Sequence, residues 1–153
     1  MTRRLIGALA IITTLLLSGC GNDYGVDQYG QKVAAERLDK QWLVVNYWAE
    51  WCGPCRTEIP ELNALAEQLK GQNVGVFGVN FDNVQGEELK AASDKLGIKF
   101  TVLAQNPDGI FEIPRSEALP VTYIIDDKGK VREQLMGEQT AEGVLAKLMA
   151  LRG

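Results

Sequence analysis

The sequence predicts an α/β domain in which helices flank a mixed β-sheet, and three patterns support this fold class. Two apolar, β-prone runs at 43–48 and 74–80 are separated by a helix-length stretch, which is typical of a parallel crossover unit. Two further runs at 121–125 and 130–136 are joined by an Asp-Asp-Lys-Gly turn, which predicts an antiparallel hairpin. A helical pattern then begins after Thr140 and closes the chain.

The helix between the first two strands should begin at the Gly53-Pro54 turn and end near Gly71. Proline is tolerated in the first turn of a helix, whereas Pro60 lies deeper and should kink this one. Its buried face should consist of apolar residues that recur at helical spacing, namely Ile59, Leu62, Leu65, Ala66 and Leu69.

The segment between the second strand and the hairpin contains two further elements. Residues 86–96 form an amphipathic pattern that predicts a helix, and residues 99–103 predict a short strand. The following segment, 106–119, contains an Asn-Pro-Asp-Gly turn signal and another proline, so we expect it to be irregular. The last helix should bury Val144, Leu145, Leu148 and Leu151.

The N-terminal residues have the pattern of an export signal. Arg3 and Arg4 precede an apolar run at 5–17, which is too short for a comfortable transmembrane helix and is typical of a signal peptide. The tetrapeptide Leu17-Ser18-Gly19-Cys20 resembles the bacterial lipobox. That resemblance implies cleavage before Cys20 and lipidation of its sulfur and new amino group. An ordinary secretory signal with an incidental cysteine is the alternative.

We therefore divide the chain into a signal peptide at 1–19, a lipidated tether at 20–28 and one domain at 29–153. Removal of the signal leaves 134 residues, enough for one compact domain but too few for two. The removed piece takes two of the 16 basic residues and none of the 20 acidic ones, so the net charge moves from −4 to −6. This acidity argues against nucleic-acid binding.

Cys52 and Cys55 form a Cys-X-X-Cys pair directly after the first strand. At a helix N-terminus such a pair can close a disulfide, and the helix dipole stabilises the thiolate of the first cysteine. A structural zinc site needs four ligands, whereas this chain has three cysteines and no histidine. A structural disulfide remains an alternative, although so short a loop would constrain little of the unfolded chain. The pattern favours reversible dithiol-disulfide exchange, with no metal and no bound cofactor.

The run 46–55 resembles the active-site strand and turn of thioredoxins, and Pro60 falls where those proteins kink their first helix. Three further features resemble the TlpA/ResA-like membrane-anchored thiol-disulfide oxidoreductases. These are the lipobox, the run 56–60 after the second cysteine, and an extra helix and strand at about 81–105 inserted before the loop at Pro120. The resemblance covers essentially the whole chain after the signal peptide and implies a thioredoxin-like fold.

Cys52 should be the nucleophile, because its sulfur would lie at an exposed helix N-terminus. Cys55, one turn further in, should resolve the mixed disulfide. The resemblance implies that Pro120 follows a cis peptide bond in a loop that faces the cysteines. It also places the substrate beside this loop and the cysteine turn. The residues expected to contact substrate are Trp51, Gly53, Pro54, Leu119 and Pro120.

Proton transfer is where this chain departs from thioredoxins. Those proteins place a buried aspartate at the strand position that is Asn46 here, and an amide cannot accept the proton of the resolving thiol. Glu58, one helical turn after Cys55, matches an acidic residue of the TlpA/ResA-like pattern and is the candidate base. The alternative is that Glu58 is a solvated helix carboxylate, as we expect for Glu61.

The resemblance implies a lipid-anchored, extracytoplasmic thiol-disulfide oxidoreductase that acts as a monomer. The Gly-Pro dipeptide between the cysteines favours a reductant, since thioredoxin lies at about −270 mV and DsbA at about −120 mV. The expected partners are exported proteins with disulfides, such as apocytochrome c, and a membrane electron donor of the DsbD or CcdA type. Gly21 follows Cys20 where an aspartate often retains lipoproteins in the inner membrane, so the outer membrane is favoured in a cell with two membranes.

Other functions remain open at this stage. A disulfide-forming oxidase or isomerase would use the same fold and the same cysteines, and a non-catalytic binding module would not need them. A copper-delivery protein on this fold would normally add a histidine ligand, which the chain lacks. A peroxidase of the peroxiredoxin group would need its own reactive-cysteine loop, which we do not find in the sequence.

Overall fold

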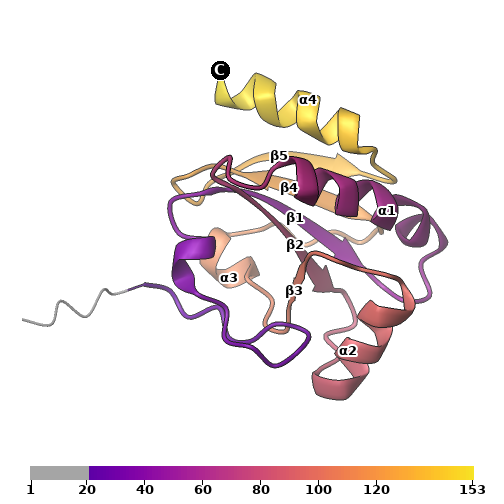
Figure 1. Cartoon of the computed structure of the whole chain (residues 1–153). Coiled ribbons are helices and arrows are strands. Elements are labelled where there is room, and N and C mark those ends of the chain that lie inside the picture. Colours follow the sequence, from indigo (N-terminus) through magenta and orange to yellow (C-terminus); the bar gives the residue numbers. More distant parts are fainter. Residues whose placement is uncertain (1–20) are drawn as a thin grey trace, which may run out of the picture.

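The computed structural model describes residues 21–153 and contains one five-stranded sheet with the order β3-β2-β1-β4-β5 (Figure 1). The first three strands run parallel, whereas β4 is antiparallel to β1 and β5 is antiparallel to β4. The strands are β1 (Trp42–Trp48), β2 (Val74–Asn80), β3 (Thr101–Leu103), β4 (Val121–Ile125) and β5 (Val131–Met136). The predicted mixed sheet is therefore confirmed.

Helices cover both faces of this sheet (Figure 1). They are the short 3-10 helix η1 (Ala35–Arg37) and the α-helices α1 (Gly53–Gln68), α2 (Gly86–Lys95), α3 (Asp108–Phe111) and α4 (Ala141–Arg152). One buried cluster joins the sheet to α1 and α4 through residues such as Leu62, Leu65, Val144 and Leu148. A second cluster lies on the other face, beneath α3 and the N-terminal segment, and includes Tyr24, Phe111 and Tyr123.

β1 is the central strand, and its side chains point alternately to the two faces of the sheet. Val44 and Trp48 pack in the cluster on the α1 side, whereas Leu43, Val45 and Tyr47 pack in the cluster on the opposite side. All residues of β1 after the first are buried, because the strand is hydrogen-bonded to a neighbour on each edge and covered on both faces. β1 therefore carries the chain through the core to the cysteine turn.

Two segments differ from the sequence prediction. The stretch expected to be irregular contains the four-residue helix α3, whose Phe111 is buried against the sheet. The expected tether at 20–28 is wrong from Tyr24 onward, because Tyr24 is 2% exposed and Gln28 is 5% exposed. The Gln28 side chain is hydrogen-bonded to Val102 of β3 and to the Phe100 carbonyl just before it, so the domain begins before residue 29. The predicted signal peptide and the lipidation of Cys20 lie outside the described residues.

Candidate active site

The N-terminus of α1 positions the two cysteines. Cys52 is the residue that caps the helix, and its Sγ accepts a hydrogen bond of 3.3 Å from the backbone N–H of Cys55. Cys52 and Cys55 are joined in a disulfide. Because β1 ends four residues before Cys52, the pair lies where the carboxyl end of the central strand meets the positive end of the helix dipole.

Cys52 is less exposed than we expected, with 4% of its surface accessible, and Cys55 is fully buried. The neighbouring residues Gly53 and Pro54 are exposed, and Trp51 keeps 64% of its surface. In the disulfide-bonded state a polypeptide approaching the pair therefore meets these three neighbours before it meets sulfur.

The loop before β4 lies beside the end of β1. The Leu119–Pro120 peptide bond is cis, as predicted, and Val121 is the register partner of Tyr47. Pro120 is buried and its carbonyl accepts a 2.9 Å hydrogen bond from Gly137, whereas Leu119 is half-buried. This pairing fixes the proline loop to the strand that leads into the cysteine turn.

Two contacts on the other side of the turn were not predicted. The indole Nε1 of Trp51 donates a 2.8 Å hydrogen bond to Asp82, and the Arg56 guanidinium donates to the Glu50 carbonyl. Asp82 directly follows β2, and the carboxyl ends of parallel strands meet at one edge of a sheet. The position of Asp82 after β2 was a usable signal in the sequence, and its hydrogen bond fixes the exposed ring of Trp51, the residue next to Cys52.

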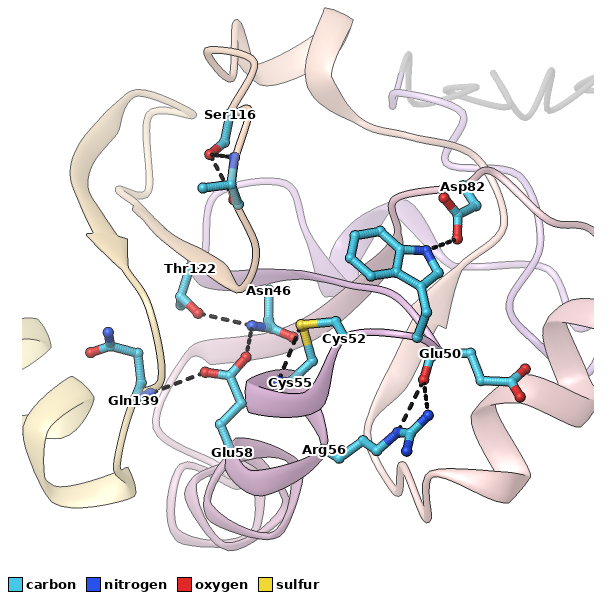
Figure 2. Close-up of a disulfide and its surroundings, with 12 residues drawn as sticks. Asn46, Glu50, Cys52, Cys55, Arg56, Glu58, Asp82, Ser116, Thr122 and Gln139 are labelled. Carbon is cyan, nitrogen blue, oxygen red and sulfur yellow. Dashed lines mark hydrogen bonds between the residues drawn. A yellow bond between two sulfur atoms is a disulfide. The ribbon is translucent and has the colours of Figure 1, made fainter.

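The Glu58 side chain is fully buried one helical turn after Cys55 (Figure 2). Its Oε1 accepts a 2.7 Å hydrogen bond from Asn46 Nδ2, and its Oε2 accepts a 3.1 Å hydrogen bond from the backbone N–H of Gln139. Asn46 Nδ2 also donates to Thr122 Oγ1 at 3.0 Å. The carboxylate is thus held between the central strand and the loop that leads into α4.

Burial raises the pKa of the Glu58 carboxyl from 4.5 to about 7, because the charged form loses water. The hydrogen bonds from Asn46 and Gln139 lower this pKa in part, and the nearby Glu138 charge raises it. A carboxyl group with a pKa near neutrality can both accept and release a proton at physiological pH. The alternative of a solvated helix carboxylate is therefore wrong for Glu58.

Asn46 has an unused acceptor next to this network. Its buried Oδ1 finds no hydrogen-bond partner among residues 21–153, although both of its N–H groups are directed to Glu58 and Thr122. In Figure 2 the Asn46 amide lies between the Glu58 carboxylate and the cysteine pair.

The described part of the chain contains neither a metal site nor a membrane span. Within residues 21–153, no three acidic or cysteine side chains are grouped so that they could hold a metal ion. None of the helices in this range has the length and apolarity needed to cross a bilayer.

Comparison with solved structures shows the fold. The StoA structure from Bacillus subtilis superposes with a TM-score of 0.63 at 17% identity, over 81% of this chain and 94% of that one. A thioredoxin-family thiol:disulfide interchange protein from Chlorobium tepidum superposes with a TM-score of 0.70 at 24% identity, over 84% of this chain and 92% of that one. The sheet and helices described above are those of a thioredoxin-like domain.

Comparison of sequences extends this likeness to the family. Residues 16–134 match the AhpC/TSA family. The thiol-disulfide oxidoreductase ResA of Bacillus thuringiensis is 32% identical over 125 residues, which cover 80% of this chain and 72% of ResA. The thioredoxin-like protein YneN of Bacillus subtilis is 29% identical over 121 residues, with 78% and 70% covered. These matches show that the chain belongs to the AhpC/TSA family. Together with the disulfide at the start of α1, they identify it as a thiol-disulfide oxidoreductase of the ResA type.

Proposed function

We propose that this oxidoreductase is anchored outside the cytoplasm and reduces disulfide bonds in exported proteins. The observation that carries the proposal is the combination of the Cys52–Cys55 disulfide at the N-terminus of α1 with a buried carboxyl group, Glu58, one turn further along. Such a site has the three groups that dithiol exchange requires, namely a nucleophile, a resolving thiol and a proton acceptor.

The reaction begins with both cysteines reduced. The Cys52 thiolate, stabilised by the helix N-terminus, attacks one sulfur of a substrate disulfide. A new bond forms between Cys52 Sγ and that sulfur, and the substrate S–S bond breaks. The second substrate sulfur leaves as a thiolate and takes a proton from water.

The second step closes the enzyme disulfide. Glu58 in its carboxylate form accepts the proton of the Cys55 thiol, and the resulting thiolate attacks Cys52 Sγ. The bond between Cys52 and the substrate breaks, and the first substrate sulfur leaves as a thiolate. Two electrons have then passed from the dithiol to the substrate, and the protein is left with the Cys52–Cys55 disulfide found in the structure.

Substrate is held beside the nucleophile by both sides of the turn. The exposed ring of Trp51, fixed by its hydrogen bond to Asp82, and the exposed Gly53 and Pro54 offer one surface. The half-buried Leu119 and the loop at Pro120 offer the other. An extended segment of an unfolded protein fits this arrangement, because it presents backbone groups and a cysteine without steric hindrance.

The sequence supports the proposed direction and location of the reaction. The Gly-Pro dipeptide favours a reducing potential, and the resemblance of residues 17–20 to the lipobox supports a lipid anchor at Cys20. Gly21 favours the outer membrane if the cell has two. A reductant in an oxidising compartment must be re-reduced, so a donor of the DsbD or CcdA type is required, and apocytochrome c is a candidate substrate.

Trapping of mixed disulfides tests the proposal. A Cys55→Ala variant cannot complete the second step, so exported proteins should accumulate as covalent adducts of Cys52 that a reducing agent releases. The matched control carries Cys52→Ser as well as Cys55→Ala and should trap nothing. Adducts formed through Cys52 with cysteine-containing exported proteins support the function, whereas equal recovery from both variants contradicts it.

A further inference from the structure

Residues 24–33, which we call the N-terminal strap, are fixed along the edge strand β3. Gln28 N–H donates to the Val102 carbonyl at 3.0 Å, and Ala104 N–H donates to the Val26 carbonyl at 2.9 Å. The buried Gln28 side chain adds two bonds, to Phe100 O at 3.1 Å and from Val102 N–H at 2.8 Å. The strap therefore completes the edge of the sheet and belongs to the folded domain.

The strap leaves almost no free chain next to Cys20. Tyr24 is 2% exposed, its hydroxyl donates a 2.7 Å hydrogen bond to Asp39, and its ring stacks on Phe111 at 5.8 Å between centroids. Only residues 21–23 separate Cys20 from this anchored side chain. Fully extended, the four steps from residue 20 to residue 24 reach about 14 Å.

The chain joins the domain at the end opposite to the cysteines. Gly21 packs against η1, where a Cβ atom at Gly21 would lie 2.8 Å from Ala35 Cβ, and Asn22 N–H donates to Asp39. These residues precede the amino end of β1, whereas the cysteine turn follows its carboxyl end (Figure 1). A strand of this length spans about 20 Å. The attachment point and the redox site thus lie at opposite ends of the sheet.

We propose that a lipid anchor on Cys20 holds the domain with Cys52 and Cys55 turned away from the membrane that carries it. This inference rests on the proposed lipidation. Turning the cysteines toward that bilayer would need more than about 20 Å of free chain, and the link supplies about 14 Å. Detaching the strap to gain length would expose Tyr24 and break the buried hydrogen bonds of Gln28.

The orientation decides which partners reach Cys52. Exchange takes place with thiols and disulfides carried by polypeptides in the aqueous space, or by domains that project far from a membrane. A donor whose exchanging thiols lie at the surface of the anchoring bilayer does not meet the site. If the anchor is in the outer membrane, the cysteines face the inner membrane, from which a projecting donor domain can deliver electrons.

Fluorescence quenching on vesicles tests this orientation. The full chain, lipid-modified in a bacterial host, is reconstituted in vesicles whose headgroups carry a short-range quencher. In the Cys55→Ala variant a fluorophore is attached to Cys52. In a second variant, with Cys52→Ser and Cys55→Ala, it is attached at the exposed position of η1 through Glu36→Cys. The label at residue 36 should be quenched at least about threefold more strongly, because it lies roughly 20 Å nearer the attachment point.

A longer link is the control. Ten Gly/Ser residues inserted between Gly21 and Asn22 extend the reach by about 33 Å and should abolish the difference in quenching. Equal quenching of the two labels without the insertion would overturn the orientation while leaving the lipid anchor intact. A chain that remains in solution and does not float with vesicles would instead contradict the lipid anchor itself, and this inference with it.

Discussion

Glu58 and Glu61 lie one helical turn apart on α1, yet their surroundings give them different roles. Glu58 is fully buried and receives hydrogen bonds from Asn46 and from the backbone of Gln139. Glu61 is exposed and accepts a 2.9 Å hydrogen bond from Ala141 N–H at the start of α4. The resemblance to the TlpA/ResA-like pattern identified Glu58 as a candidate, but its burial involves a loop 81 residues further along the chain and could not be derived from local pattern.

The substitution of an amide for an acid at position 46 has a structural consequence. Asn46 cannot take a proton, but its two N–H groups fix the Glu58 carboxylate relative to Thr122 and the central strand. In the proposed mechanism the proton acceptor is therefore on the helix, and the strand residue Asn46 orients it. The sequence showed the departure from thioredoxin, whereas the hydrogen-bonding partner of Asn46 became visible only in the folded chain.

The first prediction concerns the rate of the second exchange step. In Glu58→Gln the resolving thiol has no base one turn away, so decay of the mixed disulfide at Cys52 should slow by about 100-fold. In the unsubstituted protein this rate should fall below a pH of about 7, as Glu58 becomes protonated. Stopped-flow measurement of the decay of a mixed disulfide between Cys52 and a model thiol follows both effects. Glu61→Gln is the matched control, and an unchanged rate in Glu58→Gln would exclude Glu58 as the base.

The second prediction concerns stability against pH. The folded, oxidised protein holds the Glu58 proton up to a pH of about 7, whereas the unfolded chain releases it near 4.5. Because the folded state binds more protons in this window, the free energy of unfolding should fall as pH rises, by up to about 3 kcal/mol. In urea titrations between these pH values, the free energy of unfolding should change less with pH in Glu58→Gln than in the unsubstituted protein. In Glu61→Gln its change with pH should equal that of the unsubstituted protein. Parallel curves for Glu58→Gln and the unsubstituted protein would contradict the raised pKa.

At the scale of elements, the sequence predicted the strands whose pattern is local and missed the segments that depend on distant contacts. β1, β2 and the hairpin of β4 and β5 were predicted correctly because their apolar runs and the Asp-Asp-Lys-Gly turn are visible within a few residues. The N-terminal strap was missed because most of its residues are polar or glycine and its partner strand, β3, lies more than 70 residues further along the chain. α3 was missed because four residues after a turn signal contain too little periodicity to indicate a helix.

The third prediction tests whether the strap is part of the cooperative fold. Gln28→Ala leaves Val102 N–H and the Phe100 carbonyl without their side-chain partner, so unfolding should become easier by about 2–4 kcal/mol. Gln31→Ala, at an exposed position of the same segment, should change the free energy of unfolding by less than about 0.5 kcal/mol. Denaturant titration of both variants gives the comparison. If both variants lost less than about 0.5 kcal/mol in the free energy of unfolding, the strap would detach without affecting the domain.

At the scale of the whole molecule, the central sheet separates the proposed lipid attachment from the cysteine pair. η1, against which Gly21 packs, lies before the amino end of β1 (Figure 1), whereas the cysteine turn and the proline loop lie at its carboxyl end. The same strand, β1, links the two ends and carries Asn46, which donates a hydrogen bond to Glu58. The proposed reductive function and the proposed orientation therefore both depend on this central, buried strand.

The reduction potential of the Cys52–Cys55 pair tests the central claim most directly. Equilibration of the oxidised protein with dithiol buffers of known potential, followed by quantification of the two free thiols, gives the value. A reductant should have a potential of about −270 mV, as the Gly-Pro dipeptide favours. A potential above about −150 mV would contradict the proposed direction and identify the protein as a disulfide-forming oxidase.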